Sequence, residues 1–188
     1  MTVDPYASGV LEPETHARLV LDIENYARDA GVQPRWIWTA LAETVGKAEV
    51  EYVRQYKSHG QADGVKGMCC VRKDDHCDPA TRMAAIAGAL VRNFIRARVM
   101  TLGVVLDMLA TRDTPDATCL LIPNFFQAKA EGGSIAPWQI GALFDLLLQR
   151  SQTGSQTIVY VTDMKALSTE YGVAFADLFT DHYLTVSI

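Results

Sequence analysis

The sequence lacks several features that would place it in a common class of protein. No two cysteines have the paired spacing of a zinc finger, so a structural zinc site of that kind is not predicted. The longest apolar stretches, such as Met83 to Val91, are too short to cross a bilayer. Positive charge is not in excess, because the formal net charge is −5, which argues against a generally basic nucleic-acid-binding protein.

We also expect no signal peptide, because no basic segment precedes an apolar run at the start of the sequence. We therefore expect a cytoplasmic protein. The cysteines Cys69, Cys70, Cys77 and Cys119 are then predicted to be reduced and mostly buried, since free cysteine behaves as a small hydrophobic residue. Cys69 and Cys70 are adjacent on a predicted strand, so they should face opposite sides of a sheet.

The length and composition are typical of one folded α/β unit with a small helical extension. The chain has 188 residues, of which 49% are hydrophobic and 21% are charged. Apolar residues recur at helical spacing over 13–30 and again over 34–59, with Gly46 as a weak point in the second region. Trp36 and Trp38 begin that second region. Core packing is the usual role of such rings, and docking of a partner protein is the alternative.

After the polar segment 58–64 the pattern changes to strands that alternate with helices. Strands are predicted at 67–71, 97–101, 118–123, 157–162 and 184–188. Helices are predicted at 81–95, 102–110, 137–151, 164–171 and 174–180. Apolar strands between amphipathic helices indicate a buried, mostly parallel sheet. The predicted organisation is a helical N-terminal segment over 1–60 and an α/β core over 61–188.

The stretch 65–90, VKGMCCVRKDDHCDPATRMAAIAGAL, has the layout of a phosphate-binding strand, loop and helix. Such a loop works because glycines let backbone N–H groups surround a phosphate, while lysine neutralises charge and Ser or Thr holds magnesium. From Lys73 to Ala80 there is no glycine. Ala80 stands at the lysine position and Pro79 removes a backbone donor, so only Thr81 is retained.

The same loop carries negative charge where a phosphate would need the opposite sign. Asp74, Asp75 and Asp78 would face a polyphosphate. One like-charge pair about 4 Å apart costs about 4 kcal/mol at an effective dielectric near 20. The loop also contains residue types that bind divalent metals, so an unorthodox nucleotide- or metal-dependent enzyme is an alternative. No complete ligand set is visible, and we predict no metal site.

From about Val65 to Ile188 the sequence resembles the ATPase core of DnaC/IstB-type helicase loaders, a branch of the AAA+ family. The run MAAIAGALVRNFIRARVMTLGVVLDML resembles the segment that follows the P-loop in that family. TCLLIPNFF occupies the place of the Walker B strand, and GALFDLLLQRSQTGSQTIVYVTDM resembles the helix and sensor-1 strand. The resemblance implies a Rossmann-like, AAA+-type core.

The other motifs implied by this resemblance are altered as well. A Walker B strand ends in an acidic pair that serves magnesium and the attacking water, but Pro123 and Asn124 stand there. Asp163 follows the sensor-1 strand, and the place of the arginine finger, 176–179, has no arginine. We therefore expect a pseudo-ATPase without a cofactor. Its degenerate nucleotide-site positions are Lys73, Asp74, Asp75, Asp78, Ala80, Thr81, Pro123, Asn124 and Asp163.

Four basic residues could contact phosphates of single-stranded DNA, as the resemblance to loader cores implies: Arg92, Arg96, Arg98 and Lys129. A solvated helix face is the alternative explanation. The function that we expect is that of a non-catalytic accessory DNA-replication protein, with a mobile element as a candidate source. It would contact a replicative helicase or an AAA+ partner. A regulatory or structural subunit that joins an AAA+ oligomer is the alternative.

Overall fold

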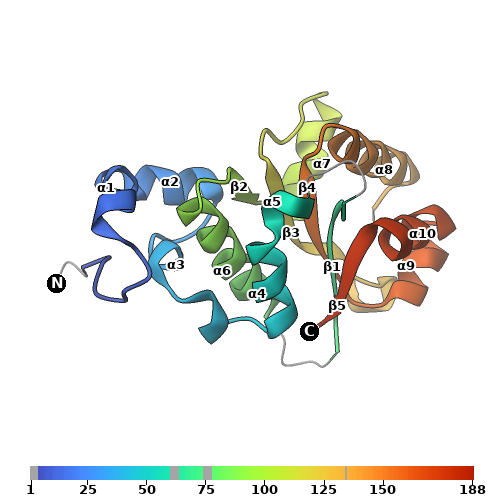
Figure 1. Ribbon diagram of the computed structural model, residues 1–188. Coiled ribbons are helices and arrows are strands. Elements are labelled where there is room, and N and C mark those ends of the chain that lie inside the picture. Colours follow the sequence, from blue (N-terminus) through green and yellow to red (C-terminus); the bar gives the residue numbers. More distant parts are fainter. Residues whose placement is uncertain (1–3, 60–63, 74–77, 134) are drawn as a thin grey trace.

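A five-stranded parallel sheet lies at the centre of the protein (Figure 1). The computed structural model describes residues 4–59, 64–73, 78–133 and 135–188. The strand order is β2-β3-β4-β1-β5 and every pairing is parallel, which confirms the predicted sheet. The strands are β1 (Gly67–Val71), β2 (Ala97–Val99), β3 (Cys119–Phe126), β4 (Gln156–Val161) and β5 (Tyr183–Ser187).

Each of the five helices predicted after the first strand is present. They are α6 (Pro79–Arg92), α7 (Leu102–Ala110), α8 (Pro137–Gln152), α9 (Met164–Glu170) and α10 (Val173–His182), and a short 3-10 turn η2 (Lys129–Glu131) follows β3. Because strands and helices alternate along the chain, each crossover places a helix on one face of the sheet.

The N-terminal segment is helical, as predicted, but it is divided into shorter pieces. These are α1 (Pro13–Leu21), α2 (Ile23–Ala30), α3 (Arg35–Trp38), the 3-10 turn η1 (Leu41–Glu43), α4 (Lys47–Arg54) and α5 (Tyr56–His59). The prediction of one helix over 13–30 was wrong at Asp22. Its backbone leaves the helical region, and its carboxylate accepts a hydrogen bond from Asn25. Aspartate favours helix ends and turns over helix interiors.

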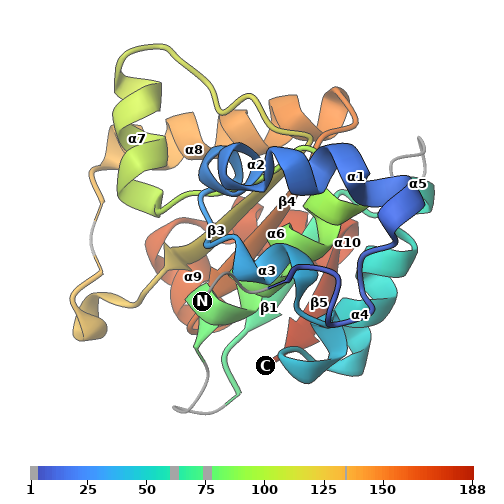
Figure 2. The ribbon, with the colours of Figure 1, turned by 90° about the vertical axis from the view of Figure 1, so that its left-hand side faces the viewer.

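The sheet separates two hydrophobic clusters. Met68 and Cys70 face a cluster formed with α6 and the N-terminal helices, whereas Cys69 faces a cluster formed with α7 to α10. Figure 2, which looks from the N-terminal side, shows the N-terminal helices in front of the sheet. The predicted opposite orientation of Cys69 and Cys70 is confirmed. Cys69, Cys70 and Cys119 are buried and form no disulfide bond among the described residues. Burial raises the pKa of Cys69 and of Cys119 to about 12.

Close packing attaches the N-terminal helices to α6. A Cβ atom at Gly88 would lie 2.2 Å from the carbonyl oxygen of Trp36, so only glycine lets α3 approach α6 this closely. Arg92 donates from Nη1 to the carbonyl oxygen of Thr39, 2.8 Å away. The predicted boundary near residue 60 falls at 60–63, outside the described residues.

A buried ion pair makes a second attachment between the N-terminal segment and α6. Glu49 on α4 is 1% exposed, and its Oε1 accepts from Nε of Arg82 at 2.9 Å. Its Oε2 accepts from the backbone N–H of Gly46 at 2.7 Å. The carboxylate is thus both paired and hydrogen-bonded, which a buried charge requires. This pair fixes α4 beside the first turn of α6.

In the part of the chain that is described, no helix has the length and apolar character needed to span a membrane.

Candidate functional site

The candidate site lies where β1 ends and α6 begins. In open parallel sheets, ligands bind outside the carboxyl ends of the strands. β1 lies between β4 and β5, so its carboxyl end has a strand on both sides. Asp74 and Asp75, two of the predicted site positions, lie outside the described residues.

Asp78 caps the N-terminus of α6 with its own side chain. Its Oδ1 accepts hydrogen bonds from the backbone N–H groups of Ala80 at 3.1 Å and Thr81 at 3.2 Å. Aspartate followed by proline at the first helical position is a favourable start for a helix. The carboxylate therefore stands where the N-terminus of this helix would hold a bound anion.

No backbone donor in the first turn of α6 is left for another anion. Pro79 has no N–H group, and the N–H groups of Ala80 and Thr81 donate to Asp78. The next N–H, that of Arg82, donates to the carbonyl oxygen of Asp78 at 3.2 Å. The usual unpaired donors of a helix start are thus satisfied within the chain.

The charge of Asp78 is stabilised by the same bonds. The hydroxyl and the amide of Thr81 both donate to this carboxylate and hold the pKa of Asp78 below its ordinary value. The positive end of the helix dipole acts in the same direction. Thr81, the residue retained from the magnesium-side position, therefore has its hydroxyl engaged by Asp78.

At the end of β3, a polar side chain is likewise hydrogen-bonded to the start of a helix. Oδ1 of Asn124 accepts the backbone N–H of Leu102, the first residue of α7, at 2.8 Å, whereas the N-cap of this helix is Thr101. Pro123 precedes it at a shift in register between Ile122 and Phe126. A proline within a central strand is tolerated at such an irregularity, because no ladder donor is needed there.

At the end of β4 the polar side chains are also used by neighbouring backbone groups. Asp163 caps α9 by accepting from the N–H groups of Lys165 at 2.7 Å and Ala166 at 2.9 Å. Thr162 is buried, and its hydroxyl oxygen accepts the N–H of Ala128 at 3.3 Å. Two polar positions of the predicted site, Asp78 and Asp163, are therefore helix caps, and a third, Asn124, accepts the first N–H group of α7.

Two cations, Arg72 and Lys73, directly follow β1. Arg72 forms an ion pair with Glu131 in the turn after β3, and this bond lowers the pKa of Glu131. The backbone N–H of Lys73 donates to the carbonyl oxygen of Ile188 at 2.6 Å, and its side chain is exposed.

A nucleoside triphosphate does not fit the residues described here. It needs free backbone donors and a lysine at the helix start, and an acidic group at the end of β3. The described donors are taken by Asp78, Ala80 replaces the lysine, and Asn124 is turned toward α7. Among the described residues, no group of three His, Cys, Asp or Glu side chains is placed to hold a metal ion.

The predicted DNA-binding residues do not form one patch. The guanidinium of Arg92 is largely enclosed and bonded to α3, whereas Lys129 is exposed at the far end of β3. Arg96 and Arg98 lie together at the edge strand β2, where Arg96 pairs with the carboxylate of Asp116 at 2.6 Å. DNA binding by these residues stays a prediction.

Trp36 and Trp38 are half-buried against the N-terminal cluster. The guanidinium carbon of Arg35 lies 4.8 Å from the ring centroid of Trp36, a cation–π contact. Internal packing therefore covers part of the surface of each ring. Docking of a partner protein on the exposed part stays a prediction.

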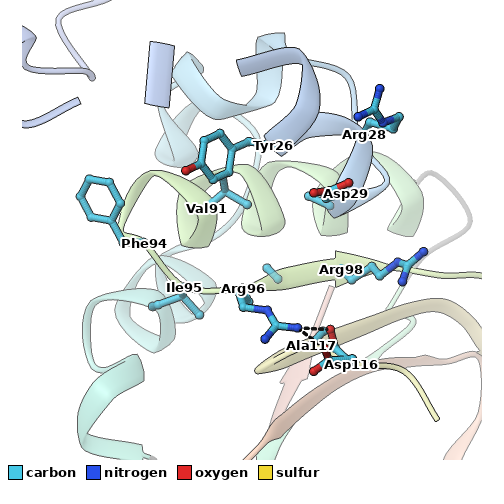
Figure 3. A pocket seen from close by; sticks show the side chains of 12 residues that line it. Tyr26, Arg28, Asp29, Val91, Phe94, Ile95, Arg96, Arg98, Asp116 and Ala117 are labelled. Carbon is cyan, nitrogen blue, oxygen red and sulfur yellow. Dashed lines mark hydrogen bonds and ion pairs between the residues drawn. The ribbon is translucent and has the colours of Figure 1, made fainter. Parts of the chain in front are cut away.

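A groove beside β2 was not predicted from the sequence. It has a volume of about 790 Å³ and lies between α2, the end of α6 and the segment around β2 (Figure 3). We call it the β2 groove. Its lining includes Tyr26, Arg28, Phe94, Arg96 and Arg98. The sequence indicated the basic residues Arg96 and Arg98 as candidates for binding. It did not indicate that side chains of α2 lie beside them in the fold.

Comparison with solved structures finds a similar fold in proteins of DNA replication initiation. A DNA replication initiation factor matches with a TM-score of 0.59 and 11% identity, over 83% of this chain and 50% of the other. The replication initiator DnaA bound to AMPPCP and single-stranded DNA matches with a TM-score of 0.57 and 12% identity, over 79% and 49%. Domain III of DnaA from Thermotoga maritima matches with a TM-score of 0.52 and 13% identity, over 83% and 68%.

The chain spans about half the length of the first two of these structures. No protein-family model and no curated protein matches the sequence. At this level of identity the likeness shows the fold alone, an α/β domain with a five-stranded parallel sheet. The narrower resemblance to DnaC/IstB loaders stays a prediction.

Proposed function

We propose that this protein is a non-catalytic accessory factor of DNA replication that works by contacts with other macromolecules. The observation that carries the proposal is the position of Asp78, whose carboxylate accepts the N–H groups that would otherwise hold a phosphate. An AAA+-like domain with that arrangement keeps its shape without needing ATP. The protein is then a pseudo-ATPase.

The fold supports the choice of DNA replication. The similar structures are replication initiators, and one of them is described as bound to AMPPCP and single-stranded DNA. The present chain shares their sheet and its covering helices. Its sequence lacks the lysine and the acidic pair that nucleotide chemistry uses.

Within this role we favour the helicase-loader kind, as the sequence resemblance implies. The partner would be a replicative helicase or another AAA+ protein, with single-stranded DNA as a second ligand. The half-buried Trp36 and Trp38 are the candidate contact residues on the N-terminal side. A mobile element is the source that we favour.

Two measurements on purified protein test the proposal. Steady-state phosphate release with ATP and magnesium should equal that of a protein-free control. Binding to the purified replicative helicase and initiator of the same organism should be saturable and equal with and without ATP. Turnover that follows the folded protein through purification contradicts the non-catalytic role. Absence of binding to both proteins contradicts the replication role.

The variants Trp36→Ala and Trp38→Ala test the contact residues. Circular dichroism and thermal unfolding first establish that each variant is folded, since both rings also pack internally. Weaker binding by a folded variant supports the contact. Unchanged binding by both variants would show that the interface does not include the two tryptophans of α3.

A further inference from the structure

The β2 groove contains two exposed aromatic rings and three arginines. Figure 3 shows Phe94 and Tyr26 toward one end of the groove and Arg28 and Arg98 toward the other. Phe94 is 62% exposed and Tyr26 is 43% exposed. These two rings line the same groove, and exposed apolar groups that are gathered in one place often mark binding sites.

Phe94 has a backbone conformation that phenylalanine rarely adopts. Its φ is 60°, in the left-handed region. It follows the C-cap Asn93 of α6, and its N–H donates to the carbonyl oxygen of Val91 at 2.9 Å, while Ile95 donates to Leu90 at 3.0 Å. This is the helix-ending motif in which glycine is the common residue. A bulky residue there is strained, and strained residues are concentrated at functional sites.

Burial does not compensate for this strain, because most of the ring is in solvent. One face of the ring is covered by His16, whose imidazole is stacked on it with a centroid separation of 5.7 Å and an interplanar angle of 10°. His16 is itself held at both ring nitrogens, by the N–H of Glu12 at 2.9 Å and the carbonyl oxygen of Arg92 at 3.1 Å. The Phe94 ring is thus supported from one side.

The charge of the groove is positive, although the whole chain is negative. Three arginines and two aspartates line it. Arg96 is paired with Asp116, and Arg28 donates to the side-chain oxygen of Asn25. Within the described residues, Arg98 has no carboxylate partner. Asp29 opposes anion binding, so the favourable charge is concentrated at Arg98 and Arg28.

We propose that the β2 groove binds single-stranded nucleic acid. Unpaired bases stack on Phe94 and Tyr26, and the backbone phosphates contact Arg98 and Arg28. Stacking rings combined with cations are the means by which proteins hold single strands without sequence preference. This inference deepens the proposed function, on which the choice of DNA as the ligand rests. The groove is remote from the first turn of α6, at the other end of that helix.

Fluorescence anisotropy with a labelled oligo-dT of about 20 nucleotides tests the inference, since this length exceeds the usual span of one single-strand site. A duplex of the same length and a labelled oligo-glutamate peptide are the comparison probes. The wild-type protein is measured beside Phe94→Gly, Arg98→Gln and the control Arg54→Gln, whose side chain is 74% exposed on α4.

We expect the wild type to bind oligo-dT more tightly than the duplex, whose bases are already stacked. Phe94→Gly should weaken binding by about 5- to 150-fold, the range for loss of one stacked base. Its melting temperature should stay equal or rise, because glycine accepts a positive φ. Arg98→Gln should reduce the salt dependence by about 0.7 in the slope of log K against log salt. Arg54→Gln should bind as the wild type does.

Equal binding of oligo-dT by wild type, Phe94→Gly and Arg98→Gln overturns the groove as the site and leaves the replication role standing. Absence of oligo-dT binding by the wild type also overturns the inference. Binding of the oligo-glutamate peptide alone, lost in Phe94→Gly, assigns the groove to an acidic protein instead. Failure of helicase and initiator binding, with groove-dependent DNA binding retained, overturns the partner part of the proposed function and not the groove.

Discussion

The variants Asp78→Ala and Asp78→Asn separate the capping role of this residue from its charge. Alanine removes the oxygen that accepts the N–H groups of Ala80 and Thr81, whereas asparagine keeps an acceptor in the same place. Asparagine is as good an N-cap as aspartate. The pair therefore distinguishes a missing hydrogen-bond acceptor from a missing negative charge.

The expected size of each effect follows from the geometry. Loss of an N-cap costs about 1 kcal/mol of folding stability, and for a domain of this size that lowers the melting temperature by about 2–4 °C. Asp78→Asn loses only the interaction of the charge with the helix dipole, about 0.5 kcal/mol at an exposed site. Urea unfolding followed by circular dichroism measures both values.

The pH dependence has a definite sign. The folded pKa of Asp78 lies below its ordinary value because Thr81 donates to the charged form. The stabilisation is therefore complete above the unfolded pKa of about 3.9 and is lost as the pH falls through the lower folded pKa. The stability difference between the wild type and Asp78→Asn should narrow below about pH 4. Equal stability of wild type and Asp78→Ala at neutral pH would refute the assignment of Asp78 as the cap of α6.

Three further substitutions test the packing that positions the site, each by urea unfolding. Arg82→Met leaves the buried carboxylate of Glu49 unpaired and should lower the free energy of unfolding by about 3 kcal/mol. Adding Glu49→Gln to the same chain should restore most of that stability. No recovery of stability in the double variant argues against the ion pair. Gly88→Ala should destabilise by about 1–3 kcal/mol through contact with the Trp36 carbonyl, whereas Gly141→Ala, with open space at its Cβ position, should be neutral or stabilising. Arg150 is 5% exposed and donates to the carbonyl oxygens of Ala117 at 3.0 Å and Gln156 at 2.7 Å. Arg150→Lys should therefore lower the free energy of unfolding by about 3 kcal/mol. A decrease below about 0.5 kcal/mol would show that these hydrogen bonds are dispensable.

The sequence was sufficient to predict the sheet, because its strands are short apolar runs bounded by polar turns. β1 and α7 have the predicted bounds, Gly67–Val71 and Leu102–Ala110. The helices of the N-terminal segment were harder to predict. Asp22 ends α1 and begins α2, and periodicity alone does not reveal such a break.

The residues of the candidate site were identified, but their roles were not. The sequence alone shows that residues 74–80 contain neither glycine nor lysine. The hydrogen bonds of Asn124 and Asp163 could not be predicted, since they depend on where α7 and α9 begin relative to the strand ends. The pairing of Glu49 with Arg82 joins residues far apart in the chain and carries no local signal.

The β2 groove was missed for a related reason. Phe94 lies inside the helix predicted over 81–95. The helix ends at Arg92 instead, and the chain reverses at Phe94, which leaves the ring in solvent. A helix end displaced by a few residues thus changes which side chains reach the surface.

Isothermal titration calorimetry of the purified chain with ATP and magnesium tests whether the candidate site at the start of α6 binds ATP. Since the chain's own carboxylate occupies the donors at the start of α6, we predict no saturable heat up to about millimolar ATP, the upper range of ordinary substrate affinities. A saturable isotherm with one site per chain, abolished in a folded Thr81→Val variant, would contradict this explanation.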